Sequence, residues 1–185
     1  MWYGLLGIVA ALVLYLIYAY NALVSNKNLV GEGWSGIDVQ LRRRADLIPN
    51  LIETVKGYAA HEDKLFRDIA DLRAKSIAGG SVAEQSQVGQ AMSAALGRVF
   101  AIAEAYPELK ADANFRDLQD KLSAIEDEIQ LSRRYYNGTV RNLNTMIESF
   151  PSNFVANFFR FTKSDFFDIG DVAARNVPKV DFKTR

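Results

Sequence analysis

The chain has 185 residues, with 22 basic and 22 acidic side chains and therefore no net charge at neutral pH. This balance argues against a nucleic-acid-binding protein, which would carry a basic excess. The absence of Cys excludes disulfides, thiol catalysis and cysteine metal sites, and the single His excludes most histidine metal centres. We therefore expect neither a nucleic-acid partner nor a cofactor.

The N-terminal segment is uniformly apolar, since the first 26 residues carry no charge and the first charged residue is Lys27. A helix of about 20 apolar residues spans the roughly 30 Å hydrocarbon core of a bilayer. Aromatic residues such as Trp2 and Tyr20 stand at the two ends of the run, where their rings favour the lipid–water boundary. Residues 1–24 are predicted to form a transmembrane helix in contact with the lipid bilayer.

Two alternatives to a retained anchor fit less well. A signal peptide would have a basic start and a shorter apolar run with an A-x-A-like end, which this segment lacks. A buried core helix rarely exceeds about 14 uninterrupted apolar residues. Basic residues follow the run at Lys27 and Arg42–Arg44 but do not precede it. The positive-inside rule then predicts a single pass with the N-terminus outside and the body in the cytoplasm.

After the anchor, apolar residues recur every three or four positions, which is the helical period. The pattern predicts helical stretches over residues 30–76, 82–105 and 112–149, and no stretch has the period-two alternation of a strand. We therefore predict an all-α fold, in which residues 25–168 form an antiparallel bundle of four long helices. Residues 169–185 contain few large apolar side chains and are predicted to form a loose tail.

Pro49 lies inside the first helical stretch and should remove one backbone hydrogen bond. We expect either a kink there or a helix that starts afresh after Asp46. Rods of about 70, 36 and 57 Å, at 1.5 Å per residue, cannot cover one another's apolar stripes completely. A further element around residues 152–168, or another subunit, is expected to cover the remainder.

A charged cluster lies on the first long helix and is made by Asp38, Arg42, Arg43, Arg44 and Asp46. Both carboxylates are four residues from Arg42, so they can pair with it along one helix face. The favoured interpretation is a solvated, salt-bridged face. A docking patch for an acidic partner is the main functional alternative, and binding to lipid headgroups is the lesser one.

Three asparagines, Asn50, Asn137 and Asn144, lie near the apolar stripes. A buried Asn needs hydrogen-bond partners, and a polar residue in a helical seam usually fixes the alignment of the helices. We interpret these residues as register-setting, and a ligand site is the less favoured alternative.

Eight of the eleven Phe residues lie at or after position 150, and Phe154, Phe158 and Phe161 would share one helical face. This aromatic contact surface could cover the bundle, bind a partner or a second copy, or touch the bilayer together with Arg160 and Lys163.

Catalytic motifs are weak in this sequence. A metal cluster of His61, Glu62, Glu104 and Glu126 is conceivable in a bundle core, but a solvated or capping His61 is the favoured interpretation. Residues 79–81 mark a stop and a turn, and they lack the Lys-Ser/Thr of a phosphate-binding loop. We therefore predict no catalytic, cofactor-binding or metal-binding residue.

Several strings in the chain are distinctive: Trp34-Ser35, the run from Ile37 to Arg44, Asp46-Leu47-Ile48-Pro49-Asn50-Leu51, Tyr106-Pro107-Glu108-Leu109 and Tyr136-Asn137. In these strings the chain resembles the LemA family of bacterial membrane-anchored helical proteins, from about residue 21 to residue 167. The resemblance implies a transmembrane helix, an antiparallel bundle and an outside N-terminus, but no activity. One departure is Gly33, where the family pattern has Ala, and we expect this Gly to loosen the start of the first long helix.

The sequence as a whole predicts a membrane-anchored, non-catalytic interaction scaffold in the bacterial inner membrane, with unidentified protein partners. The alternative is a homo-oligomer that organises or shapes the membrane. Some relatives in the resembled family are linked to membrane organelles of magnetic bacteria, and Gly7-x-x-x-Ala11 could bring two anchors together. A metal-dependent enzyme is the least favoured hypothesis.

Overall fold

The computed structural model describes residues 2–59 and 61–167, and within them it contains six helices and no strand. The helices are α1 (Trp2–Lys56), α2 (Asp63–Ala78), α3 (Val82–Ala103), α4 (Pro107–Ala111), α5 (Ala113–Glu148) and α6 (Ser152–Phe158). The prediction of an all-α fold with a long apolar N-terminal helix is confirmed. The predicted loose tail of residues 169–185 lies outside the described residues.

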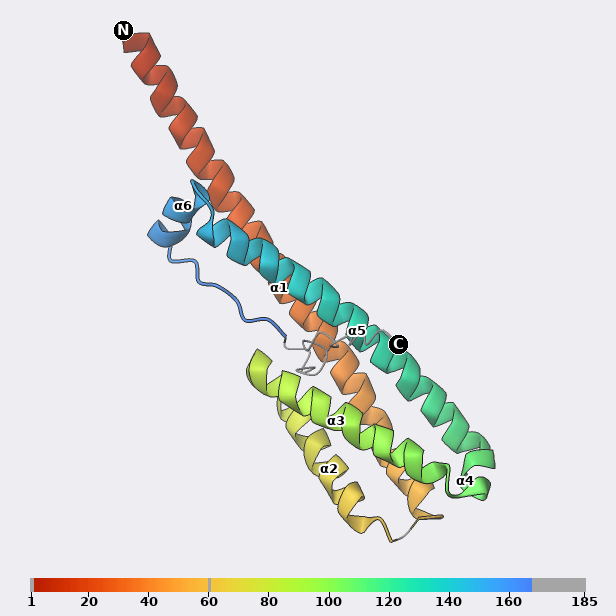
Figure 1. Ribbon diagram of the computed structural model, residues 1–185. Coiled ribbons are helices and arrows are strands. Elements are labelled where there is room, and N and C mark those ends of the chain that lie inside the picture. The colour runs from red at the N-terminus through yellow and green to blue at the C-terminus, as the bar shows by residue number, and fades with distance from the viewer. Residues whose placement is uncertain (1, 60, 168–185) are drawn as a thin grey trace, which may run out of the picture.

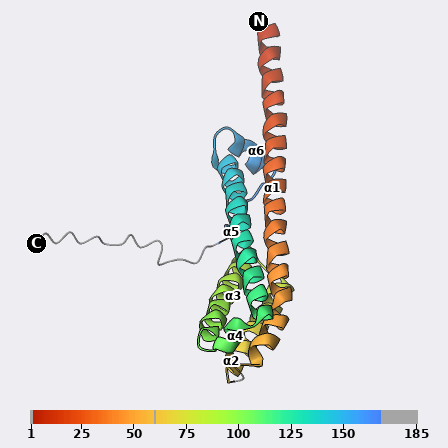
Figure 2. The same cartoon turned by 90° about the vertical axis from the view of Figure 1, so that its right-hand side faces the viewer.

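The dominant element is α1, a continuous helix of 55 residues. Its N-terminal part projects alone beyond every other helix (Figures 1 and 2). The most apolar window of this helix has a mean hydropathy of 2.0, so the helix is long and apolar enough to cross a membrane. All residues from Trp2 to Leu14 are exposed in spite of this apolar character. The boundary between anchor and bundle predicted near residue 24 therefore falls inside one continuous helix, whose side chains change from exposed to packed along its length.

The partner of α1 over most of its length is α5, which runs antiparallel beside it (Figures 1 and 2). Their seam buries residues from successive turns of both helices, including Ile37 and Leu41 of α1 and Ile129 and Val140 of α5. Gly33 lies in this seam, where an added Cβ would stand 3.1 Å from the Tyr136 Cα. Gly33 therefore permits close packing of α1 against α5, and α1 continues through it. The expected loosening stays a prediction.

At the far end of the bundle, α2 folds back on α1 and pairs with α3 (Figure 1). The core there joins Leu51 and Val55 of α1 to Ile69 of α2 and Val99 of α3. The helix predicted over residues 30–76 is thus divided into α1, which ends at Lys56, and α2, which begins at Asp63, and it is not interrupted near Asp46. The reversal covers the apolar stripe of α1 with that of α2, which a single long rod would leave exposed.

The break also supplies the fourth long helix, so the bundle is built from α1, α2, α3 and α5. The element expected around residues 152–168 is instead the short α6, followed by an extended segment. The predicted stop at residues 79–81 is confirmed, because Gly79 and Gly80 have φ of 76° and 149° and Ser81 caps α3. The Ser81 hydroxyl accepts from the Glu84 N–H, and the Glu84 carboxylate accepts from the Ser81 N–H.

Pro49 lies within α1, and the helix continues through it. A proline at this position cannot donate to the carbonyl of residue 45, four positions earlier. That carbonyl, on the buried Ala45, accepts a hydrogen bond of 2.8 Å from the Arg73 Nε of α2. A side chain of the neighbouring helix therefore replaces the backbone donor that proline removes.

We predict that Arg73 and Pro49 are energetically coupled. Arg73→Met should lower the free energy of unfolding by about 1–2 kcal/mol, because the Ala45 carbonyl loses its donor. In a Pro49→Ala background the same substitution should cost less, since the amide of residue 49 can then donate to that carbonyl. Denaturant unfolding of the four chains in a double-mutant cycle measures the coupling. Strictly additive effects would contradict this explanation.

Candidate functional site

A side-chain clamp on α5 holds the extended segment that follows α6. Asn137 Nδ2 donates to the Phe167 carbonyl at 3.0 Å, and the Phe167 N–H donates to Asn137 Oδ1 at 2.9 Å. Asn144 makes the same pair of bonds with Ser164, both at 2.9 Å. Each side-chain amide thus satisfies the N–H and the C=O of one residue, as a neighbouring strand would.

The spacing of the two asparagines explains why the clamp works. Seven residues of helix advance about 10.5 Å, and three residues of extended chain advance about 10 Å. Asn137 and Asn144 therefore match Phe167 and Ser164 in an antiparallel direction. Between them, the Tyr136 hydroxyl donates to the Asp165 carbonyl at 2.8 Å. Burial raises the pKa of Tyr136, and nearby Asp165 adds to that shift.

The register prediction is thus only partly matched by the contacts. Asn137 and Asn144 fix an alignment, but of an extended segment on a helix and not of two helices. Asn50 does not belong with them, because it is exposed on α1. Its position near the apolar stripe places it beside the core and not inside it.

A buried charge cluster lies between α1, α3 and α5. Arg44 is 1% exposed, and its Nη1 donates to Glu126 Oε2 at 2.8 Å and to Ser93 Oγ at 3.1 Å. Its Nη2 faces the Gly89 carbonyl at 3.4 Å. Burial lowers the pKa of the Arg44 guanidinium, and the Glu126 carboxylate opposes that shift.

A second buried guanidinium, that of Arg133, lies beside the first. Its Cζ is 4.7 Å from the centre of the Phe167 ring, a cation–π contact. Its Nε and Nη2 have no hydrogen-bond partner among the described residues. Burial lowers the pKa of Arg133, and Arg44 lowers it further against the effect of Glu126. Gly89 makes room here, since an added Cβ would lie 3.1 Å from the Arg133 Nη2.

The charged cluster predicted on α1 is divided by this arrangement. Arg42 pairs with Asp38 at 2.9 Å on an exposed face, as a salt-bridged face requires. Arg44 cannot join a docking patch, because it points into the bundle and is bonded there. Arg43 and Asp46 instead border a shallow groove of about 710 Å³ between α1 and α5. Across the groove, α5 contributes two more charged side chains, Lys121 and Glu128.

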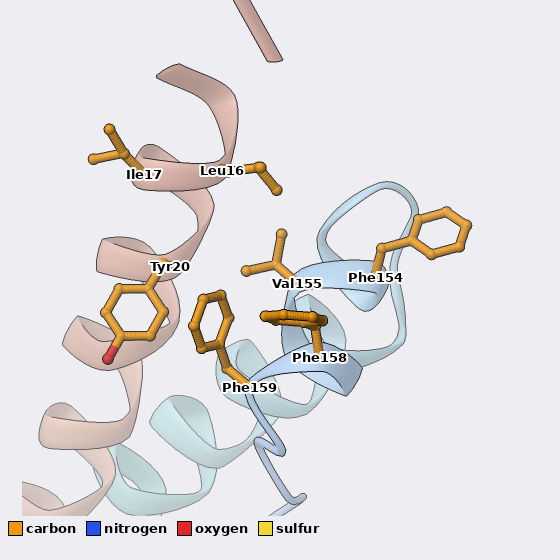
Figure 3. Close-up of a pocket in the computed structure, with 7 residues that line it drawn as sticks. All are labelled: Leu16, Ile17, Tyr20, Phe154, Val155, Phe158 and Phe159. Carbon is orange, nitrogen blue, oxygen red and sulfur yellow. The ribbon is translucent and has the colours of Figure 1, made fainter. Parts of the chain in front are cut away.

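A second groove, of about 570 Å³, separates α6 from the apolar part of α1. We call it the aromatic groove, and Figure 3 labels its lining residues: Leu16, Ile17, Tyr20, Phe154, Val155, Phe158 and Phe159. Phe159 lies between Tyr20 and Phe158, with ring centres 4.7 and 5.0 Å away. Phe154 points away from α1. The lining carries no charged side chain.

Phe161 does not share a helical face with Phe154 and Phe158, because α6 ends at Phe158. Arg160 has a left-handed φ of 58°, and the Phe161 N–H donates to the Ala156 carbonyl at 2.9 Å. This arrangement is a Schellman turn, which directs Phe161 back onto the bundle near Tyr20. The predicted aromatic surface therefore divides into two exposed rings and one that packs.

The residues weighed as a metal cluster do not come together. Glu126 bonds Arg44, Glu104 pairs with Lys110, and His61 is exposed. Within residues 2–59 and 61–167, no group of three or more His, Asp or Glu side chains is placed to hold a metal ion.

These features define a class of protein: a long apolar helix that continues into an antiparallel helical bundle, with no assembled metal group among the described residues. A model of the LemA family matches residues 33–182. The chain belongs to the LemA family.

Three individual relatives share about a quarter of their aligned residues with this chain. The magnetosome protein MamQ 2 of Paramagnetospirillum magneticum is 24% identical over 185 residues, covering 86% of this chain and 68% of the relative. The magnetosome protein MamQ of Magnetospirillum gryphiswaldense is 24% identical over 178 residues, with 82% and 65% covered. The protein LemA of Metamycoplasma hominis is 26% identical over 168 residues, with 89% and 73% covered.

Sequence reasoning missed several residues that matter in this geometry. Arg133 and Gly89 were not singled out, and neither was Arg73. The two asparagines spaced by seven on one helix were a usable signal for the clamp. Nothing local distinguishes Arg44 from its neighbours, except that it falls between the apolar positions Leu41 and Ile48 on the buried face.

The clamp can be tested by hydrogen exchange. We predict that Asn137→Ala and Asn144→Ala each speed exchange of the amides of residues 161–167 by about tenfold, because each removes two hydrogen bonds worth about 1.4 kcal/mol together. Asn50→Ala is the matched control and should leave that segment unchanged. Equal exchange in all three variants would show that the segment is held by other contacts.

Glu126 should be more important for stability than an exposed carboxylate on the same helix. Glu126→Gln keeps the shape but removes the charge that faces two buried guanidinium groups, so we predict a loss of about 2–3 kcal/mol in the free energy of unfolding. Asp117→Asn breaks only the exposed pair with Lys121 and should cost less than about 1 kcal/mol. Denaturant unfolding in detergent micelles gives both values, and similar losses would refute the distinction.

Proposed function

We propose that this protein is a membrane-anchored, non-catalytic adaptor. Residues 2–24 span the bacterial inner membrane, and the bundle holds protein partners at its cytoplasmic surface. The observation that carries the proposal is the continuity of α1, whose exposed apolar part passes into the bundle without a break. A bundle joined to its anchor by one helix is held at a fixed height, which suits a positioning role.

The contact surface in this proposal is the charged groove between α1 and α5, bordered by Arg43, Asp46, Lys121 and Glu128. Charges of both signs on a solvated rim favour recognition of a protein with complementary charges. The orientation follows from Lys27, Arg42 and Arg43, which lie exposed beyond the apolar run.

We predict that the full chain stays in the membrane fraction after carbonate extraction. Because the protein has no Cys, single-cysteine variants report its topology cleanly. In intact spheroplasts, an impermeant maleimide should label Trp2→Cys and leave Ser123→Cys on α5 unlabelled until the membrane is permeabilised. Labelling of Ser123→Cys in intact cells would overturn the cytoplasmic placement. Release of the chain by carbonate would overturn the anchor itself.

Partner binding needs its own measurement. A photo-crosslinking residue at Arg43 or Asp46 should capture the same protein band in living cells, whereas one at exposed Asn50 should not. Identical capture at all three positions, or none at any, would contradict the assignment of the groove.

The second candidate is a homo-oligomer that organises the membrane. It is favoured by the free face of the anchor, where a Cβ added at Gly7 meets no atom within 4 Å, and by relatives named as magnetosome proteins. Light scattering in detergent distinguishes the two candidates. Our proposal expects a monomer at micromolar concentration, and a stable oligomer would favour the second.

A further inference from the structure

The segment around α6 exposes several aromatic rings to solvent. We call the rings of Phe150, Phe154, Phe158 and Phe159 the aromatic face, and they are 79%, 65%, 80% and 50% exposed, respectively. Exposed aromatic rings gathered in this way on a short segment are unfavourable in water and usually mark a contact with a protein or a membrane.

The position of α6 along the anchor indicates which of these contacts applies. The aromatic groove places α6 opposite Leu16 and Tyr20, which lie about 21 and 27 Å along α1 from Trp2 at 1.5 Å per residue. A hydrocarbon core is about 30 Å thick, so α6 lies at the level of its last third. The first charge, Lys27, is about 10 Å further on. The aromatic face is therefore set at the depth where lipid begins and not in the aqueous region.

The charges around α6 agree with that depth. The segment from Ser149 to Phe159 carries no charged side chain. Charges resume on both sides of it with Glu148, which pairs with Lys163, and with the exposed Arg160. Basic side chains at the edge of an aromatic surface are suited to the phosphates of the headgroup layer.

We propose that the aromatic face of α6 inserts into the leaflet on the bundle's side of the membrane, and that acyl chains fill the aromatic groove. The proposal rests on the proposed function in one respect, because residues 2–24 must span the bilayer. The occupant is lipid because the groove is lined on one side by Leu16 and Ile17, which belong to the exposed apolar part of α1 proposed to span the bilayer (Figure 3). Its lining offers a partner no charge and almost no hydrogen-bonding group.

The consequence is a second attachment of the bundle to the membrane. The buried side chains Val155 and Ala156 fix α6 to α1 and α5, so the inserted rings are rigidly joined to the bundle. One helix alone would leave the bundle free to rotate about the anchor axis. Insertion of α6 beside it defines which face of the bundle turns toward the membrane, and adds protein to one leaflet only.

The test uses the full chain with Trp2→Phe and Trp34→Phe as background, reconstituted in vesicles of phosphatidylcholine and phosphatidylglycerol. Their acyl chains are brominated either near the glycerol backbone or near the methyl end, since bromine quenches nearby tryptophan. Single tryptophans are then introduced at Phe154, Phe158, Leu12 or Val39. Leu12 reports on the anchor, and Val39 is an exposed bundle residue that serves as the aqueous control.

We expect Phe154→Trp and Phe158→Trp to lose roughly half of their fluorescence to the shallow bromines and less to the deep ones, as for an interfacial segment. Leu12→Trp should be quenched most by the deep bromines, and Val39→Trp by neither. The four substituted side chains are all exposed, so all four chains should keep the helical circular dichroism of the parent.

Four other outcomes overturn the inference in distinguishable ways. Quenching at Leu12 without quenching at either Phe position, with red-shifted emission there, would place α6 in water while the anchor stands. Blue-shifted emission without quenching at the two Phe positions would show that protein, such as a second copy, covers the aromatic face. Quenching at Phe154 but not at Phe158 would show that lipid does not enter the groove. An unquenched Leu12→Trp would defeat the proposed anchor as well.

Discussion

The continuity of α1 is the constraint on which the rest of the fold depends. One helix passes from a fully exposed apolar stretch into the centre of the bundle, and α2, α5 and α6 all pack directly against it. No linker separates the exposed apolar part of α1 from its part in the bundle, so the position of the bundle follows from the position of that apolar part. This is possible only because Pro49, which would normally interrupt such a helix, lies opposite a donor that repairs the hydrogen-bond ladder.

The same physical solution recurs where the chain departs from regular structure. Arg73 donates to a helix carbonyl that has lost its amide partner, and Asn137 and Asn144 satisfy the backbone of a segment that has no sheet to join. In each case a polar side chain from a packed helix supplies the missing backbone partner. Unpaired backbone groups in a buried site are costly, so these few residues decide where irregular chain can lie.

Much of this fold could be predicted from the sequence, because apolar periodicity reports directly on helices. The second and third predicted stretches agree with α3 and α5 to within a few residues, and the glycines at 79 and 80 mark the turn between α2 and α3. The break after Lys56 was missed, since the apolar period continues across it and only Gly57 signals a change. The partners of Arg44, Asn137 and Asn144 could not be predicted, because they lie 20 to 82 residues away in the chain.

The polarity of the side chains changes along the length of the molecule. Among the described residues, the buried guanidinium groups of Arg44 and Arg133 lie in the middle of the bundle, where Arg44, Glu126 and Ser93 bond one another across three helices. Toward the anchor the seam between α1 and α5 becomes apolar, and at α6 even the exposed side chains are mainly aromatic. A charge cluster beside α6 would oppose the proposed contact with lipid. The cluster around Arg44 lies far from α6, and there it fixes how the helices align. In the proposed arrangement, this separation lets the bundle be specific in water and compatible with lipid at the end nearer the apolar part of α1.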